Sequence, residues 1–131
     1  MRILIVDDAD AIRRMIEALV SSRSYEVETA ASGTKALDMA MANVPDVVLL
    51  DLNMPGTHDG FAVCRALRES ELTRGVTIIV ITAMDDAESR ARAFAAGASA
   101  YYTKPFSPMA LLKELDAVRV RHNSTPKLPP S

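Results

Sequence analysis

Short apolar runs typical of buried strands alternate with segments of helical periodicity, and this alternation constrains the fold more than any other feature of the chain. Strands are predicted at residues 3–6, 25–30, 46–50, 76–81 and 98–103, and a helical segment follows each of them. Strands that alternate with helices are joined by right-handed crossovers, which make the sheet parallel and place helices on both of its faces. The sequence therefore predicts an α/β three-layer sandwich with a five-stranded parallel sheet and five helices.

Residues that favour helix ends mark the boundaries of these helices. Asp10, Ser32 and Ser107 are predicted to cap the first, second and fifth helices, and Asp85 with Glu88 has the spacing of a capping box before the fourth. Gly97 is expected to terminate the fourth helix and Pro45 to stop the second. The residues expected to face the core are Ile12, Met15, Ile16, Leu19, Val20, Leu37, Ala40, Met41, Val44, Phe61, Cys64, Leu67, Ala91, Phe94, Ala95, Leu111, Leu112, Leu115 and Val118.

Charged residues follow the apolar runs at the points where the strands end. Asp7 and Asp8 follow the first strand, Asp51 the third and Lys104 the fifth, and Thr82 lies at the end of the fourth. Because the carboxyl ends of parallel strands meet at one edge of the sheet, we expect these side chains to form one cluster. Neighbouring carboxylates repel one another unless a cation joins them, and oxygen ligands suit a hard ion. The sequence predicts a magnesium site with a lysine beside it.

Size and composition limit what is built around this cluster. A chain of 131 residues with 49% hydrophobic content has about the size and apolar surface of one domain. Its formal net charge of -2 gives no general attraction to nucleic acid or to an anionic membrane. The single Cys64 cannot form an internal disulfide, and the amino terminus runs into a strand instead of a leader peptide. We therefore expect a cytoplasmic protein that has no membrane span and binds no nucleic acid directly.

From residue 1 to about residue 120 the chain resembles the receiver domain of two-component response regulators. Each matching segment is short, but together they cover nearly the whole chain in the same order. The resemblance implies the flavodoxin-like sheet order 2-1-3-4-5. The segments are Val6-Asp7-Asp8, Asp51-Leu52-Asn53-Met54-Pro55, Ile81-Thr82-Ala83 and Lys104-Pro105-Phe106.

The resemblance assigns a role to each residue of the acidic cluster. Asp51 is implied to accept a phosphoryl group from the phosphohistidine of a histidine kinase. Asp8 and Asp51 would ligate Mg²⁺ directly, with Mn²⁺ as an alternative ion, Asn53 would contribute its backbone carbonyl, and Asp7 would act through a water. Lys104 would pair with a phosphoryl oxygen, as suits a mobile point charge. Phosphoryl transfer depends mostly on positioning and cationic stabilisation, so the residue types fit this chemistry.

The resemblance also implies a switch that transmits the new charge. The Thr82 hydroxyl would donate to the phosphoryl group, and Tyr101 matches the family's switch aromatic, which turns inward. The surface of the fourth helix, fifth strand and fifth helix would then change shape. The bond between Lys104 and Pro105 is expected to be cis. A receiver of this kind catalyses only its own phosphorylation and dephosphorylation, so we expect a regulator and not an enzyme acting on other substrates.

Partners follow from the same resemblance. A sensor histidine kinase or a phosphotransfer protein would supply the phosphoryl group, and an effector protein or a C-terminal output domain would respond to it. Residues 1–121 are interpreted as the receiver domain and residues 122–131 as a proline-rich tail or a truncated linker. We expect a monomer or a weak dimer.

Three positions depart from the family pattern. The loop after Asp51 is one residue longer than usual, with Gly56, residue 57 and His58 before Asp59-Gly60. Met84 lies two residues after Thr82, where polar residues are common, and could shield an acyl phosphate from water. Ser99 and Ala100 replace an acidic pair that joins interface salt bridges in the winged-helix subfamily, so dimerisation of that type is not expected.

Alternative functions share parts of this pattern. A hydrolase of the haloacid-dehalogenase type also uses an aspartate nucleophile with magnesium, but it needs a second aspartate where this chain has Asn53. A flavodoxin-like flavin binder needs a phosphate-binding loop after the first strand, where Asp7 and Asp8 would repel the phosphate. A third alternative is a receiver fold that acts mainly as a scaffold for protein interaction.

Overall fold

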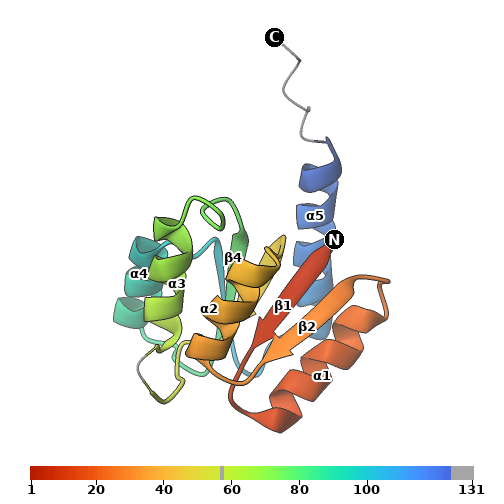
Figure 1. Ribbon diagram of the computed structural model, residues 1–131. Helices are drawn as coiled ribbons and strands as arrows, with labels where there is room; N and C mark the ends of the chain where they lie inside the picture. Colours follow the sequence, from red (N-terminus) through yellow and green to blue (C-terminus); the bar gives the residue numbers. More distant parts are fainter. Residues whose placement is uncertain (57, 125–131) are drawn as a thin grey trace.

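The computed structural model describes residues 1–56 and 58–124, except for the side chains of residues 122–124. Within these residues five strands and five helices alternate, as the sequence predicts (Figure 1). The elements are β1 (Arg2–Val6), α1 (Asp10–Ser21), β2 (Glu26–Ala30), α2 (Gly33–Ala42), β3 (Val47–Leu50), α3 (Gly60–Glu69), β4 (Thr77–Thr82), α4 (Ala87–Ala96), β5 (Ala100–Thr103) and α5 (Pro108–Ser124).

The strands form one parallel sheet in the order β2-β1-β3-β4-β5, which confirms the predicted topology. Val6 of β1 is in register with Leu50 of β3, and Thr82 of β4 with Thr103 of β5. The strands therefore end side by side, and the residue after each strand emerges at the same edge of the sheet.

Side chains of successive strand residues point to opposite faces of the sheet, and each face has its own apolar core. Ile3 and Ile5 of β1 pack with residues of α1 and α5. Leu4 and Val6 pack with residues of α2, α3 and α4. These three helices lie on the other face of the sheet from α1 and α5 (Figure 1). All residues of β3 are buried, as expected for a central strand covered on both faces. These two cores hold the carboxyl edge of the sheet rigidly in place.

Three helix ends are as predicted. The Ser32 side chain accepts a hydrogen bond from the Lys35 N–H at 3.2 Å, and Ser107 accepts one from the Ala110 N–H at 3.2 Å. Gly97 ends α4 with a φ of 115°, a left-handed conformation in which a Cβ would be strained. A Cβ there would also lie only 2.5 Å from Cγ of Arg68, so the close packing of this turn requires glycine.

The predicted caps of two other helices are wrong by one residue. Ala9 is the N-cap of α1, and Asp10 is the first helical residue, where its carboxylate pairs with Arg13 instead. The N-cap of α4 is Asp86, whose carboxylate accepts from the Ser89 N–H at 2.9 Å, and not Asp85. In both places the helix begins one residue away from the predicted position, which is within the usual uncertainty of helix boundaries.

The predicted inner face of α4 is also wrong. Ala91, Phe94 and Ala95 are exposed, and the helix instead buries Ala93 and Ala96, together with Ser89. Met15, Met41 and Val44 were expected in the core but are exposed at 49%, 37% and 38%.

The interpreted boundary between domain and tail falls inside α5, because this helix extends to Ser124. Most of the tail, residues 125–131, lies outside the described residues.

Candidate functional site

The backbone carries three charged side chains just past the ends of their strands. The Asp51 N–H donates to the carbonyl of Val6 at 3.0 Å, and the Lys104 N–H donates to that of Thr82 at 2.7 Å. The Asp7 N–H likewise donates to the carbonyl of Ala30 at 3.2 Å. Each of these hydrogen bonds extends the pairing of the strands by one residue and so fixes the backbone position from which the side chain projects.

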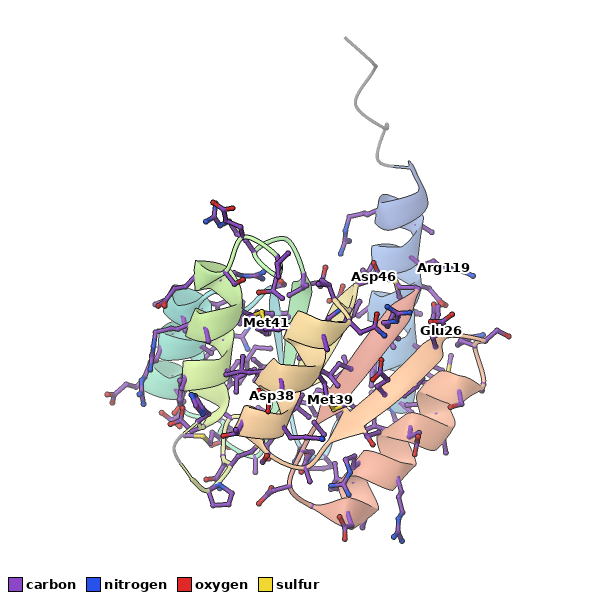
Figure 2. The ribbon with its side chains drawn as sticks, viewed as in Figure 1. Glu26, Asp38, Met39, Met41, Asp46 and Arg119 are labelled. Atoms are coloured by element: carbon purple, nitrogen blue, oxygen red, sulfur yellow. The ribbon has the colours of Figure 1, made fainter. Side chains whose placement is uncertain are left out.

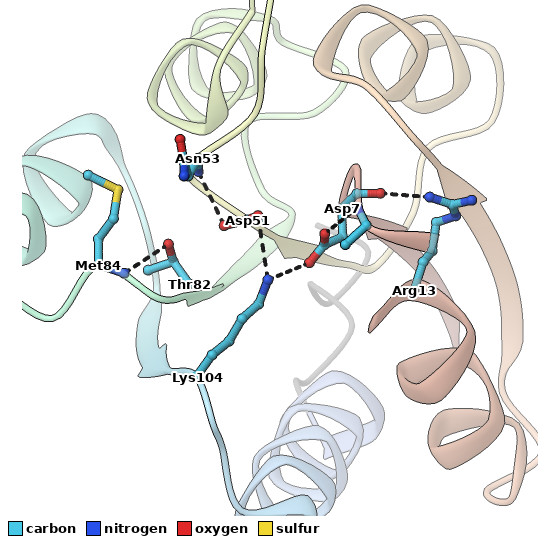
Figure 3. Close-up of polar contacts among 8 residues, drawn as sticks. Asp7, Arg13, Asp51, Asn53, Thr82, Met84 and Lys104 are labelled. Carbon is cyan, nitrogen blue, oxygen red and sulfur yellow. Dashed lines mark hydrogen bonds and ion pairs between the residues drawn. The ribbon is translucent and has the colours of Figure 1, made fainter. Parts of the chain in front are cut away.

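Lys104 lies between two buried carboxylates at this edge (Figure 3). Its Nζ is 2.7 Å from Oδ2 of Asp7 and 3.5 Å from Oδ2 of Asp51. The side chains of Asp7 and Asp51 are only 3% and 7% exposed, so water screens their charges weakly. One ammonium faces two carboxylates, and the pocket keeps an excess of negative charge.

The surroundings of Asp51 disfavour its ionised form. Burial raises the pKa of the Asp51 carboxyl above its usual value, and the charge of Asp7 adds to this effect. A hydrogen bond from the Asn53 N–H at 3.2 Å, the Lys104 charge and the Thr82 hydroxyl all lower the pKa but do not cancel the rise. An additional cation beside Asp51 would stabilise the carboxylate.

Lys104 shows the opposite balance. Burial disfavours its ammonium form, but the hydrogen bond to Asp7 and the charges of Asp51 and Asp7 outweigh burial and raise the pKa of Lys104. The lysine therefore stays cationic at neutral pH and can pair with an anion that reaches Asp51.

Asp8 completes a group of carboxylates that fits a metal ion. One oxygen each of Asp7, Asp8 and Asp51 lies within 4.8 Å of the other two. Asp8 is exposed, whereas the other two are buried, so the group opens to solvent on the Asp8 side. An all-oxygen donor set with excess negative charge suits Mg²⁺, which keeps several waters and needs few protein ligands. Asn53 is exposed, and its N–H donates to Oδ1 of Asp51.

Thr82 and Tyr101 meet at the β4–α4 loop. Thr82 is fully buried, and its Oγ1 accepts a hydrogen bond from the Met84 N–H at 3.3 Å (Figure 3). The Tyr101 hydroxyl donates to the Met84 carbonyl at 2.5 Å, and Tyr101 as a residue is only 8% exposed. Tyr101 is thus already turned inward, and the Met84 backbone links it to Thr82, which lies near Asp51.

Arg13 is a residue of this site that the sequence did not single out. Its guanidinium donates to the backbone carbonyl of Asp7 at 2.9 Å (Figure 3). It also pairs with the carboxylate of Asp10. The only signal in the sequence is an arginine one helical turn after Ala9, and surface helices carry arginines often enough to hide it.

The longer loop after Asp51 packs against the start of α2. Nδ1 of His58 is 3.1 Å from Oγ1 of Thr34, and a Cβ on Gly33 would lie 2.1 Å from the His58 carbonyl oxygen. Glycine at position 33 is therefore required for this close approach, and residue 57 lies outside the described residues.

Ser99, at one of the positions expected to lack an interface salt bridge, has an internal role. Its Oγ accepts from the Ile78 N–H at 3.0 Å and from Arg68 at 3.2 Å. Arg68 also donates to the Gly97 carbonyl at 2.9 Å. These contacts fasten the α4–β5 turn to α3 and β4.

An apolar pocket of about 390 Å³ opens beside Lys104. The Lys104–Pro105 bond on its rim is cis. A second hollow, of about 370 Å³, is lined in part by Asp46. Asp46 lies at the opposite edge of the sheet, where the strands begin (Figure 2). Only the first pocket adjoins the acidic group, and its lining residues are Ile12, Met15, Lys104, Pro105, Phe106 and Pro108.

Comparison with known sequences identifies the class of protein. The response regulator receiver domain family matches residues 3–116, and the chain belongs to this family. Receiver domains are the regulatory switches of two-component systems, and the pocket of Asp7, Asp8 and Asp51 fits their phosphoacceptor site and its Mg²⁺.

Individual relatives agree with this assignment. The response regulator PleD of Caulobacter vibrioides is 44% identical over 110 residues, which are 84% of this chain and 24% of PleD. The transcriptional regulatory protein ResD of Bacillus subtilis is 37% identical over 124 residues, which are 95% of this chain and 50% of ResD. The chain thus spans about a quarter to a half of the length of these curated relatives.

Solved structures agree as well. Chemotaxis protein CheY4 of Vibrio cholerae superimposes with a TM-score of 0.83 at 37% identity, over 89% of this chain and 97% of CheY4. The BeF3-activated DrrB receiver domain has a TM-score of 0.83 at 30% identity, over 92% of this chain and 97% of DrrB. Among the described residues, none of the helices combines the length and apolarity needed to span a membrane.

Proposed function

We propose that this domain is a switch in which Asp51 accepts a phosphoryl group from the phosphohistidine of a sensor histidine kinase or phosphotransfer protein. The observation that carries the proposal is the position of the Lys104 ammonium, 2.7 Å from Asp7 and 3.5 Å from Asp51, at an edge where Asp8 opens the acidic group to solvent. A buried carboxylate beside a fixed cation is a nucleophile with its charge stabilisation already in place.

In the transfer step an Asp51 carboxylate oxygen attacks phosphorus. The P–O bond forms as the P–N bond to the histidine breaks, and the electron pair of that bond stays on the imidazole nitrogen. Lys104 can pair with one phosphoryl oxygen and the Thr82 hydroxyl can donate to another, because both groups flank Asp51. Hydrolysis of the acyl phosphate by water returns Asp51 to a carboxylate and releases inorganic phosphate.

The acidic group would hold Mg²⁺, with Mn²⁺ as the alternative ion. Asp8 and Asp51 would bind it directly, Asn53 through its backbone carbonyl, and Asp7 through a water. When bound, the ion neutralises charge that develops on the phosphoryl oxygens. The support is the all-oxygen donor set and the negative excess of the pocket.

The apolar pocket beside Lys104 would receive the phosphodonor. Met15 on its rim is 49% exposed, and burying this side chain and Phe106 under a helix of the donor would bring the phosphohistidine to the edge that holds Asp51. The docked donor would thereby exclude water from the site before the phosphoryl group is transferred.

Output would run through α4, β5 and α5. The Arg90 guanidinium lies 5.5 Å from the Tyr101 ring and 5.6 Å from the Phe94 ring, and Phe94 is 40% exposed. A phosphoryl group that draws Thr82 toward it would pull on Met84 and thus on Tyr101, changing this aromatic surface. The change would be recognised by an effector protein, or by an output domain that follows the receiver of residues 1–121 through the segment 122–131. The receiver itself would act as a monomer or weak dimer.

Incubation with acetyl phosphate and Mg²⁺, followed by intact mass measurement, tests the proposal. We expect a gain of one phosphoryl group in the wild type and in Asp38→Asn, a control on the exposed side of α2, and no gain in Asp51→Asn. Turnover of a phosphate ester without a stable gain would favour the hydrolase. The absence of both would favour the scaffold.

A further inference from the structure

Arg13 joins the amino end of α1 to the turn that carries Asp7 and Asp8. Its guanidinium donates to the Asp7 carbonyl at 2.9 Å (Figure 3). The side chain is only 18% exposed and also pairs with Asp10. Two anchors on one rigid, planar group leave the guanidinium little freedom to move.

The carbonyl that Arg13 holds belongs to the peptide bond between Asp7 and Asp8. Because that bond is planar, fixing its oxygen fixes the orientation of the N–H of Asp8 and the direction in which the Asp8 chain leaves. The remaining polar atoms of Asp7 are also engaged. Its N–H donates to Ala30 at 3.2 Å, and its carboxylate accepts from the Ala9 N–H at 2.9 Å and from Lys104 at 2.7 Å.

Asp8 differs from Asp7 and Asp51 because it is exposed. The Asp8 carboxylate is restrained neither by burial nor by a close cation such as the one that binds Asp7. The orientation of this carboxylate therefore depends on the conformation of the Asp8 backbone. The Arg13 hydrogen bond is the contact that clamps this backbone from the helix side.

We propose that Arg13 is a positioning residue, which orients the Asp7–Asp8 peptide so that the Asp8 carboxylate points into the acidic group. The proposal rests on the metal site of the proposed function. Groups that orient metal ligands typically contribute about 10–100-fold to metal affinity.

Electrostatics alone predicts the opposite sign. Arg13 is a cation near an acidic group, so replacing it with a neutral residue would relieve repulsion and tighten the binding of Mg²⁺. Weaker binding after loss of Arg13 can therefore be assigned to geometry. Arg14, exposed on the same helix, supplies a matched control for the loss of one positive charge.

The test is calorimetric titration of Mg²⁺ into the wild type, Arg13→Met, Arg13→Lys and Arg14→Met. We expect affinity to fall about tenfold or more in Arg13→Met. Arg13→Lys should fall less, since lysine can donate to the Asp7 carbonyl but cannot hold both anchors. Arg14→Met should bind as tightly as the wild type or slightly tighter. Unchanged or tighter binding in Arg13→Met would overturn the proposal, and Arg13→Lys provides the comparison should Arg13→Met fail to fold.

A second readout needs no metal. Hydrogen exchange of the Asp8 and Ala9 amides, measured in EDTA, should be faster in Arg13→Met than in Arg14→Met, because the turn loses its clamp. If the wild type takes up no Mg²⁺, the metal part of the proposed function fails. The amide exchange rates alone then test whether Arg13 holds the Asp7–Asp8 peptide in place. Equal exchange in the two variants would then refute it.

Discussion

At the scale of single residues, Asp51 is placed where its own charge is costly. It is 6% exposed, and burial is the main reason that its pKa is raised. Lys104 reduces this cost, but at 3.5 Å it lies further from Asp51 than from Asp7 at 2.7 Å. The fold therefore holds Asp51 where ionisation lowers stability, and under the proposed function this is the carboxylate that accepts the phosphoryl group.

Asp51→Asn should stabilise the metal-free protein at neutral pH. In the folded wild type the raised pKa means that the proton is bound more tightly than in the unfolded chain, where the pKa of Asp is about 3.9. The stability this group contributes is fully present below that unfolded pKa and is lost as the pH rises through the folded pKa. Asparagine avoids this loss, and Lys104 keeps its partner Asp7.

Urea unfolding in EDTA over a series of pH values measures the effect. The free energy of unfolding of Asp51→Asn should exceed that of the wild type by an amount that grows from about pH 4 toward neutral pH and then levels off. Asp38→Asn, on the exposed side of α2, should follow the wild type. A lower stability of Asp51→Asn at pH 7 would contradict the prediction.

The sequence could identify those site residues whose positions follow from the strand pattern, and it could not identify those whose partners carry no sequence signal. Asp7, Asp51 and Lys104 follow buried strands, so the strand pattern alone predicts that they meet. Arg13 could not be predicted, because its partner is a backbone carbonyl that every residue possesses. The cap of α4 at Asp86 was missed because Asp85 is chemically identical and one residue away.

At the scale of elements, α4 is the helix whose orientation the sequence predicted wrongly. Alanines on several sides of this helix leave no distinct apolar stripe, and the large Phe94 was therefore expected inside. The structure places Phe94 outside, at a ring-centroid distance of 6.3 Å from Tyr101, and buries Ala93 instead. Ala93 and Ala96 lie in the core cluster that also holds residues of α3, so this helix–helix contact buries small residues in place of the larger Phe94.

Substituting leucine on the two faces of α4 tests this orientation. Ala93→Leu should lower the free energy of unfolding by about 1–3 kcal/mol, because Ala93 is 1% exposed and the added atoms overpack the core. Ala91→Leu makes the same chemical change on the exposed face and should stay within about 0.5 kcal/mol of the wild type. Urea unfolding of both variants decides, and a larger loss in Ala91→Leu would mean that α4 is rotated toward the predicted face.

At the scale of the whole molecule, topology and site are one consequence of the strand pattern. The parallel order β2-β1-β3-β4-β5 was predictable, because alternating strands and helices allow few arrangements and the matching segments span the chain. The position of the longer loop was not predictable, since its contact with Gly33 and Thr34 joins segments far apart in the sequence. His58 of this loop packs on α2, and the acidic group opens to solvent on the Asp8 side.

This opening predicts that Mg²⁺ stabilises the entire fold. An ion that binds the folded state alone adds about 2.7 kcal/mol when present at a hundred times its dissociation constant, and each kcal/mol raises the melting temperature by about 2–8 °C at this size. We expect the rise in the wild type and in Asp38→Asn, measured against sodium chloride of equal ionic strength. Asp8→Asn should unfold like the metal-free wild type and lose the rise, because Asp8 is exposed and supports no core contact. An equal rise in Asp8→Asn would place the ion elsewhere.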